Sequence, residues 1–283
     1  MARNCKNTLP SSFPYVIYKN TAFCMSRTAI ISDIHSNYHA IYAVMTDAFE
    51  QERCTEVACL GDIVGYNAHP STCLDYIRQL NCPVVKGNHD EEVVNPRYDK
   101  MNELAREAME WTVRQLSDEQ LQWLARLQYQ RIVRPSGAGT SSFTIVHSTL
   151  DQPKAWNYII NANDAAGNFS RQFSQLCFHG HTHVPKVYMW DGRHSVEDFD
   201  VKHRLVMNGY AELQPDPKYK YFINVGSVGQ PRDNDPRACY AIYDSDANLV
   251  ILKRVEYDIA GAQAAITEAG LPSYLAERLG RGC

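Results

Sequence analysis

Short apolar runs alternate with helical patterns in the first part of the chain. Residues 28–32, 57–60 and 84–85 are apolar enough for buried strands. Between them, apolar residues recur at helical spacing from Ile41 onward and again from Cys73 onward, which predicts two amphipathic helices. This order of strands and helices predicts parallel strands with helices packed against the sheet.

The alternation stops at residues 95–128. Leu104, Ala108 and Trp111 have helical spacing, and Ser117 with Gln120 forms the pattern of a capping box at the start of a further helix. No strand pattern separates these two helices. We therefore expect a helical insertion that covers one edge of the sheet.

Strand patterns dominate the second half of the chain. The last two strand patterns, at residues 238–243 and 249–255, flank a turn-rich loop at residues 244–248 and predict a hairpin. A helical pattern covers residues 260–279, whereas residues 191–219 are polar and irregular, which predicts a surface excursion. The predicted class is α/β. The strand patterns lie at residues 143–146, 176–178, 187–190, 221–225, 238–243 and 249–255.

Composition places these elements in one domain. The chain has 283 residues, and 45% of them are hydrophobic, which is enough for the core of a single large domain at residues 25–283. Residues 1–24 contain Pro10 and Pro14, show no regular period and lack the apolar centre of a signal peptide. We expect them to form a disordered extension outside the domain, with Met25 opening the domain itself.

The net charge and the cysteine content limit the classes of binding partner and the cellular compartment that we expect. A net charge of −4 argues against a protein that coats nucleic acid, since such surfaces are usually basic. No run approaches the roughly 18 apolar residues of a membrane span. The cysteines number 9, an odd count, and their spacings match no zinc motif. This usage predicts a reducing, cytoplasmic setting.

Polar clusters follow the apolar strands directly. In α/β sheets, ligands bind beyond the carboxyl ends of the strands, so clusters in that place predict one convergent site. In chain order, the clusters are Asp33 with His35, Asp62, Asn88 with His89 and Asp90, His147, and His181 with His183.

The residue types in these clusters are those that bind transition metals. If residues 33–35 and 181–183 are extended, side chains two positions apart point to the same side and can hold one ion together. Gly61, Gly87 and Gly180 remove side chains where the backbone must turn near the ions. Carboxylate and amide oxygens with imidazole nitrogens favour Mn²⁺, Fe or Zn²⁺ over Mg²⁺. We expect two divalent transition-metal ions, with Mn²⁺ as the first choice.

Together these motifs resemble those of the calcineurin-like metallophosphoesterase superfamily. The motifs are Asp-x-His, Gly-Asp, Gly-Asn-His-Asp, a single His and Gly-His-Thr-His, and the resemblance runs from about Thr28 to the end of the chain. The prokaryotic phosphodiesterase-like branch is the most similar. The resemblance to this branch rests on three sequence motifs: GDIVGY from Gly61, WTVRQL from Trp111 and GSVGQPRD from Gly226. The resemblance implies a two-sheet β-sandwich flanked by helices, in four layers.

The resemblance also implies a role for each polar residue. His89 would not bind metal but would face the phosphate as electrophile or general acid, while a hydroxide that bridges the ions attacks phosphorus. Asp90 would be an orienting group behind the ligands. The implied ligands are Asp33, His35 and His183 for one metal, Asn88, His147 and His181 for the other, and Asp62 as the bridge between them.

The expected substrate class depends on an absent arginine. Related protein phosphatases and symmetrical dinucleoside tetraphosphate hydrolases have an Arg soon after the Gly-Asp motif that clamps a phosphate. Residues 61–67 contain no arginine. A phosphomonoester dianion would therefore lack this partner, whereas a phosphodiester carries one negative charge fewer, so we expect phosphodiesters to be favoured over monoesters. The candidate substrate contacts are Arg232, His69 and Arg114, the last from a helical insertion expected to roof the site. For Arg232, a structural salt bridge to an aspartate is an equally good interpretation.

Two other functions remain open. One is a phosphomonoesterase or protein phosphatase of the same superfamily, and the other is a catalytically silent scaffold that binds metal. A scaffold would be expected to lack ligands or His89, whereas this chain has all of them. The predicted partner is a small phosphoester, and neither a membrane nor a nucleic acid is indicated.

Overall fold

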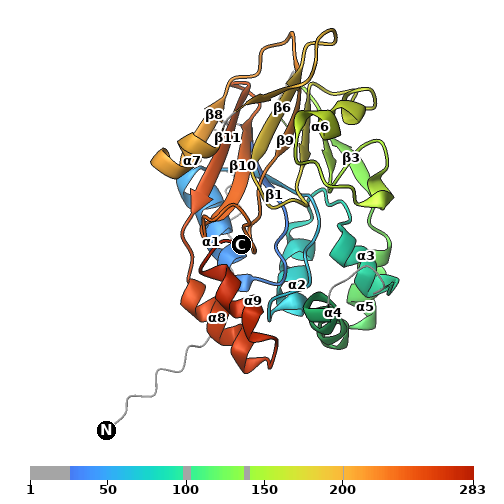
Figure 1. Ribbon diagram of the computed structural model, residues 1–283, viewed down its shortest axis with the longest axis vertical. Helices are drawn as coiled ribbons and strands as arrows, with labels where there is room; N and C mark the ends of the chain where they lie inside the picture. Colours follow the sequence, from blue (N-terminus) through green and yellow to red (C-terminus); the bar gives the residue numbers. More distant parts are fainter. Residues whose placement is uncertain (1–25, 98–102, 137–140, 200) are drawn as a thin grey trace.

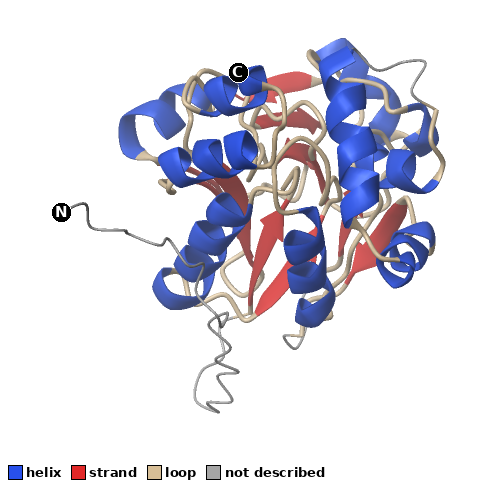
Figure 2. Cartoon of the chain, turned by 90° about the horizontal axis from the view of Figure 1, so that it is seen from below, coloured by secondary structure: helices blue, strands red, loops and turns tan. Residues whose placement is uncertain are grey.

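Two β-sheets pack face to face at the centre of the protein, and helices cover both outer faces (Figure 1). The computed structural model describes residues 26–97, 103–136, 141–199 and 201–283. Seen from below in Figure 2, the helices surround the strands. The predicted two-sheet sandwich flanked by helices is therefore confirmed, while the predicted extension at residues 1–24 lies outside the described residues.

The first sheet has the strand order β2-β1-β10-β11-β8. β1 and β2 are parallel, as predicted, and β10 with β11 forms the predicted antiparallel hairpin. The carboxyl ends of β1 and β2 therefore lie side by side. The bounds are β1 (Arg27–Ile31), β2 (Glu56–Cys59), β8 (Tyr210–Leu213), β10 (Ala238–Asp244) and β11 (Leu249–Val255).

The second sheet has the strand order β3-β4-β5-β9-β6-β7. Its strands β4, β5 and β9 are parallel, so the carboxyl ends of β4 and β5 meet at one edge. The bounds are β3 (Gln130–Val133), β4 (Phe143–Val146), β5 (Leu176–His179), β6 (Lys186–Trp190), β7 (Glu197–Phe199) and β9 (Lys220–Asn224).

Helices cover the sheets and form two groups at the lower end of Figure 1, α8 with α9 and α3 with α4 and α5. The predicted capping box is present at the start of α5, where the Ser117 and Gln120 side chains each accept the other residue's main-chain N–H. The bounds are α1 (Tyr38–Thr46), α2 (Pro70–Leu80), α3 (Asn88–Val94), α4 (Glu103–Gln115), α5 (Asp118–Ala125), α6 (Ala162–Phe169), α7 (Lys202–Asn208), α8 (Ile259–Glu268) and α9 (Ser273–Leu279).

Separate apolar cores hold the layers together. Because successive strand residues point to opposite faces, Ala29 and Ile31 of β1 pack toward the helices while Ile30 packs between the sheets. Between the sheets, the rings of Phe143 and Phe178 meet edge to face with centroids 5.3 Å apart. Burying each such side chain contributes about 1.5–3 kcal/mol. This core fixes the two sheets against each other and so fixes the loops at their ends.

Some predicted elements were wrong. Val84 and Val85 make only isolated bridges, to Cys59 and to Gln128, instead of a third full strand. Residues 191–219 are not irregular, because they contain β7, α7 and β8. β7 and β8 are edge strands whose outward side chains are exposed, so their polar composition hid the strand pattern. β3 and α6 were not predicted.

The predicted helical insertion exists as α4 and α5, which pack against α2 and α3. From α4, Ala108 and Trp111 join an apolar cluster with α8 and α9, so Trp111 is a packing residue. Within the described ranges, no helix combines the length and the apolar character needed to cross a membrane.

Candidate metal centre

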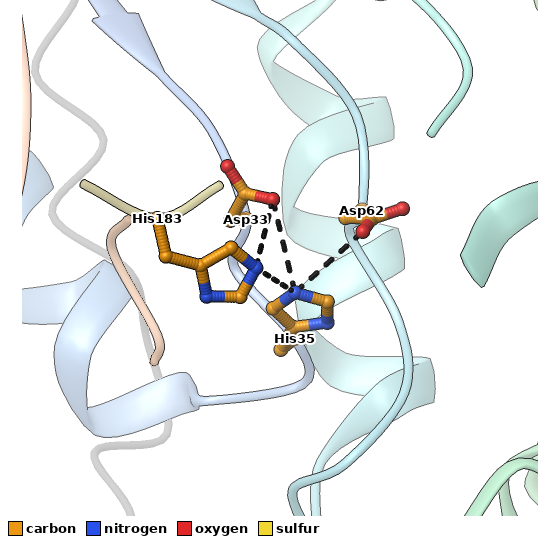
Figure 3. Close-up of side chains that lie close together, drawn as sticks. All are labelled: Asp33, His35, Asp62 and His183. Atoms are coloured by element: carbon orange, nitrogen blue, oxygen red, sulfur yellow. Dashed lines mark hydrogen bonds and ion pairs between the residues drawn. The ribbon is translucent and has the colours of Figure 1, made fainter. Parts of the chain in front are cut away.

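One group of buried side chains joins the ends of β1, β2 and β5. Asp33, His35, Asp62 and His183 each offer a ligand atom within 4.8 Å of the others (Figure 3). His183 Nε2 lies 3.2 Å from Asp33 Oδ1 and 3.1 Å from His35 Nε2. His35 Nε2 lies 3.6 Å from Asp62 Oδ2. Imidazole nitrogens and carboxylate oxygens this close together are suited to one divalent cation.

A second group shares Asp62 with the first. Asp62, His147 and His181 also offer ligand atoms within 4.8 Å of one another. His147 Nε2 lies 3.3 Å from Asp62 Oδ2 and 3.2 Å from Asn88 Oδ1. The structure thus brings all of the predicted ligands together, with Asp62 common to both groups. A carboxylate in that position can bridge two ions.

Main-chain carbonyl groups orient the histidine rings. A carbonyl oxygen only accepts hydrogen bonds, so the ring nitrogen beside it must carry the proton and the other nitrogen is free to bind metal. Nε2 is the free nitrogen in His35, His147 and His183, whereas Nδ1 is free in His181. The acceptors are Val64 for His35 (3.2 Å), Leu60 for His147 (2.9 Å), Gln230 for His183 and Trp156 for His181 (2.8 Å).

The paired ligands are not in extended backbone, contrary to expectation. Asp33 and His35 have φ values of 54° and 47°, and His181 and His183 have values of 68° and 61°. These residues lie in the left-handed region, which costs about 1–2 kcal/mol per residue for side chains with a Cβ. Tight turns after the strands, and not strand alternation, therefore aim these side chains at the centre.

Glycines allow the loops to approach each other closely, as predicted. A Cβ on Gly87 would lie 2.1 Å from Asp62 Oδ1, and one on Gly180 would lie 2.3 Å from Asp33 Oδ2. Gly61 has a φ of 91°, and its Cβ would lie 2.4 Å from the main-chain nitrogen of Gly87. Any larger residue at these positions would displace a carboxylate of the centre or a neighbouring loop.

Gly87→Ala is therefore expected to lower the melting temperature, because the added methyl group overlaps the Asp62 carboxylate. Overpacking of this kind costs about 1–3 kcal/mol. Gly167→Ala is the matched control, since its Cβ would meet only Asp151 Oδ2, at an ordinary 3.6 Å. Thermal unfolding of both variants checks this, and equal melting temperatures would contradict the close approach of the loops.

Electrostatics keep the carboxylates of the centre ionised. Burial opposes the charged form of Asp62, but the charges of His147 and His89 outweigh it and hold its pKa well below the ordinary value. Burial likewise opposes ionisation of Asp33, yet His183 keeps the Asp33 pKa low. Burial opposes the charged form of His147, but Asp62 raises the pKa of His147 to about 9. Asp33 and Asp62 are therefore ionised and can act as ligands for cations.

His89 lies beside the ligands without hydrogen-bonding to them through its ring. Its ring centroid is 4.7 Å from that of His35, and its buried Nδ1 has no hydrogen-bond partner among the described residues. Burial lowers the pKa of His89 to about 4, so the resting imidazole is neutral at neutral pH. An unpartnered imidazole here can interact with a bound anion.

Asp90 holds the loops behind the ligands in place. Its Oδ1 accepts a hydrogen bond from the main-chain N–H of Ile63 at 2.9 Å, and its Oδ2 accepts one from Gly87 at 3.0 Å. Burial and the charge of Asp62 raise the pKa of Asp90 to about 7. Asp90 thereby ties together the loops that carry Asp62 and Asn88.

Of the three predicted substrate contacts, one lies at the candidate metal centre and two do not. Arg232 lies at the centre, where its main-chain N–H donates to the His183 carbonyl oxygen at 3.4 Å. The ring of His69 packs against that of His39, with centroids 5.7 Å apart, and no hydrogen bond or ring contact between described residues joins it to the ligands. Arg114 is exposed on α4 and makes no contact with the ligands in the described chain. The expected roofing of the site by Arg114 is therefore not seen.

Sequence reasoning missed the aromatic residues around the centre. Tyr158 stacks on His181 with centroids 4.3 Å apart, and Tyr66 lies 4.8 Å from His35. Tyr158 belongs to an exposed segment without helical or strand period, so no sequence signal pointed to it. Tyr66 lies within the Gly-Asp motif region and could have been identified by its position.

Comparisons with known proteins agree with this geometry. The calcineurin-like phosphoesterase superfamily domain matches residues 27–248. An uncharacterized protein of Methanocaldococcus jannaschii is 37% identical over 256 residues, which cover 90% of this chain and 97% of that protein. The crystal structure of a metallophosphoesterase from Sphaerobacter thermophilus is 40% identical, with a TM-score of 0.77, covering 92% of this chain and 100% of that one.

A hypothetical protein from Pyrococcus horikoshii OT3 shares the fold at 16% identity, with a TM-score of 0.69 and coverage of 91% of this chain and 98% of that one. The family match extends over most of the chain and includes every predicted ligand. By fold and by sequence, the chain belongs to the calcineurin-like phosphoesterase superfamily.

Proposed function

We propose that this protein is a metal-dependent phosphoesterase that uses two divalent ions, Mn²⁺ first among them, and favours small phosphodiesters. The observation that carries the proposal is the pair of buried ligand groups that share Asp62. Ions held there would supply charge stabilisation of a phosphoryl group and an activated water nucleophile. The mixture of nitrogen and oxygen donors supports Mn²⁺ over Mg²⁺.

His89 is the proposed electrophile or general acid. Asp62 Oδ1 accepts the main-chain N–H of His89 at 2.8 Å, so the shared carboxylate also fixes the position of His89 at the start of α3. A neutral imidazole can donate its N–H to a phosphoryl oxygen. An anion bound beside it favours the protonated form, which can then protonate the leaving oxygen.

An open pocket of about 920 Å³ lies beside the segment that leads to Trp156 and has room for part of a small substrate. It is lined by residues 127–130 and 152–155. Trp156 follows directly in the chain, and its ring lies 5.9 Å from that of His147. We propose that this pocket receives one ester group of the substrate.

The preference for diesters is supported by the loop after Asp62, which carries Tyr66 and no arginine. A monoester dianion would lack a bidentate partner from this loop, and a diester carries one negative charge fewer and needs that partner less. With Mn²⁺, we expect a higher kcat/KM for bis(p-nitrophenyl) phosphate than for p-nitrophenyl phosphate or a phosphoserine peptide.

A side-by-side assay of the three substrates decides among the functions. A preference of about tenfold or more for the phosphopeptide would contradict the diester proposal and favour a protein phosphatase. Bound metal without turnover of any substrate would favour the silent scaffold.

A further inference from the structure

Two arginines from distant parts of the chain converge on Tyr66. The Cζ atoms of Arg232 and of Arg278, which belongs to α9, each lie 5.9 Å from the centroid of the Tyr66 ring. That ring lies 4.5 Å from the ring of His89 and 4.8 Å from that of His35. A single aromatic ring thus separates the C-terminal helix from the candidate metal centre.

Neither arginine has an acidic side chain as partner. Over the described ranges, no Asp or Glu carboxylate forms an ion pair with Arg232 or Arg278 within 4.0 Å. The acids that follow Arg232 in the sequence cannot serve, because other arginines already bind them. These pairs are Asp233 with Arg254 and Asp235 with Arg237.

Several guanidinium donors are left free as a result. Arg232 donates from Nη2 to Gln230 Oε1 at 2.9 Å, but its Nε is buried without a partner. Arg278 donates from Nε to the main-chain oxygen of Cys283, the last residue of the given sequence, and no bond from its terminal nitrogens is found in the described chain. Burial and the charge of Arg232 lower the pKa of Arg278. Half-buried like charges of this kind are normally compensated, and the free donors of these two side chains are available to an anion.

We propose that Arg232 and Arg278 bind a second phosphate group of the substrate, distinct from the one that is hydrolysed. This inference rests on the proposed function and narrows it to phosphodiesters that carry a further phosphate. The planar fork of a guanidinium matches a phosphate through paired hydrogen bonds. Tyr66 would hold both forks in position by packing against them.

The placement of the two arginines indicates that the phosphate they bind differs from the phosphate that is hydrolysed. Arg232 borders the ligands through its bond to the His183 carbonyl oxygen. Arg278 contacts Tyr66 and Tyr274 and, within the described residues, none of the ligands. A group bound by both arginines is therefore displaced from the ions toward α9.

A matched pair of nucleotides tests the proposal by binding alone. Calorimetry with Mn²⁺-loaded protein compares thymidine 3′,5′-bisphosphate with thymidine 5′-monophosphate. We expect wild-type protein to bind the bisphosphate at least about tenfold more tightly, as charge-assisted hydrogen bonds predict. Arg278→Gln should remove this preference, and Arg278→Lys should retain part of it. Arg281→Gln is the control, because Arg281 is exposed and packs on the ring of Tyr274 instead of that of Tyr66, so it should leave the preference unchanged.

Turnover separates this inference from the proposed function. The substrates are thymidine 5′-(p-nitrophenyl phosphate) with and without a 3′-phosphate, and Arg278→Gln should raise KM only for the phosphorylated one. A binding preference without turnover would keep the anion site and reject the phosphoesterase. Turnover without any binding preference would reject the anion site, as would equal losses on both substrates in Arg278→Gln.

Discussion

Asp62→Ala should lose most of the metal from both sites. Wild-type protein loaded with Mn²⁺ is expected to hold about two ions per chain. Removing the shared carboxylate takes one ligand from each ion and leaves their mutual repulsion unscreened. Elemental analysis after gel filtration measures the ion content directly.

Two further variants make that experiment specific. Asp62→Asn keeps an oxygen that can accept the main-chain N–H of His89 but removes the charge, so it should lose metal while α3 stays in place. Asp118→Asn changes an exposed carboxylate in the first turn of α5 and should retain both ions. If loaded wild-type protein contains no metal, the proposed centre is wrong.

His89→Ala should keep both ions and the fold yet lose turnover by about a hundredfold or more. A positioned acid or hydrogen-bond donor typically contributes about 10²–10⁴-fold, and His89 is the unpartnered imidazole nearest the first ligand group. The loss should appear in kcat, because the ions would still bind the phosphate. Initial rates on the chromogenic diester, with metal content measured on the same sample, check this.

His203→Gln is the control for that variant, since His203 is exposed on α7, away from the ligands. It should match wild-type protein in rate and metal content. Near-normal turnover in His89→Ala would remove His89 from the mechanism, whatever the metal content.

The residues of the candidate metal centre could be predicted from the sequence because their chemistry is local. Each of these residues directly follows an apolar strand pattern. Ligands bind at the carboxyl ends of strands, so polar residues in that position indicate a site. The hairpin of β10 and β11 and the capping box at Ser117 were predicted for the same reason, since a few neighbouring residues determine each. In these places local pattern and tertiary structure agree.

The remaining features depend on contacts that no local pattern contains. The left-handed turns at Asp33 and His35 are stabilised by bonds from their main-chain N–H groups to the loop after β2, at 3.0 Å and 2.9 Å. Arg278 reaches Tyr66 only because α9 folds back across the chain. The edge strand β8 was missed because only one of its faces is buried, and β7 was missed because none of its residues is fully buried.

The centre also has a consequence for synthesis of the protein on the ribosome. Its ligands come from both sheets, beginning at Asp33 and ending at His183, and the ring of His183 is oriented by the carbonyl group of Gln230. A nascent chain that has exposed only the first sheet's β1 and β2 holds carboxylates without the histidines that complete either group. The proposed ions would therefore meet complete ligand groups only after most of the chain has emerged, which would make metal capture a late step of maturation.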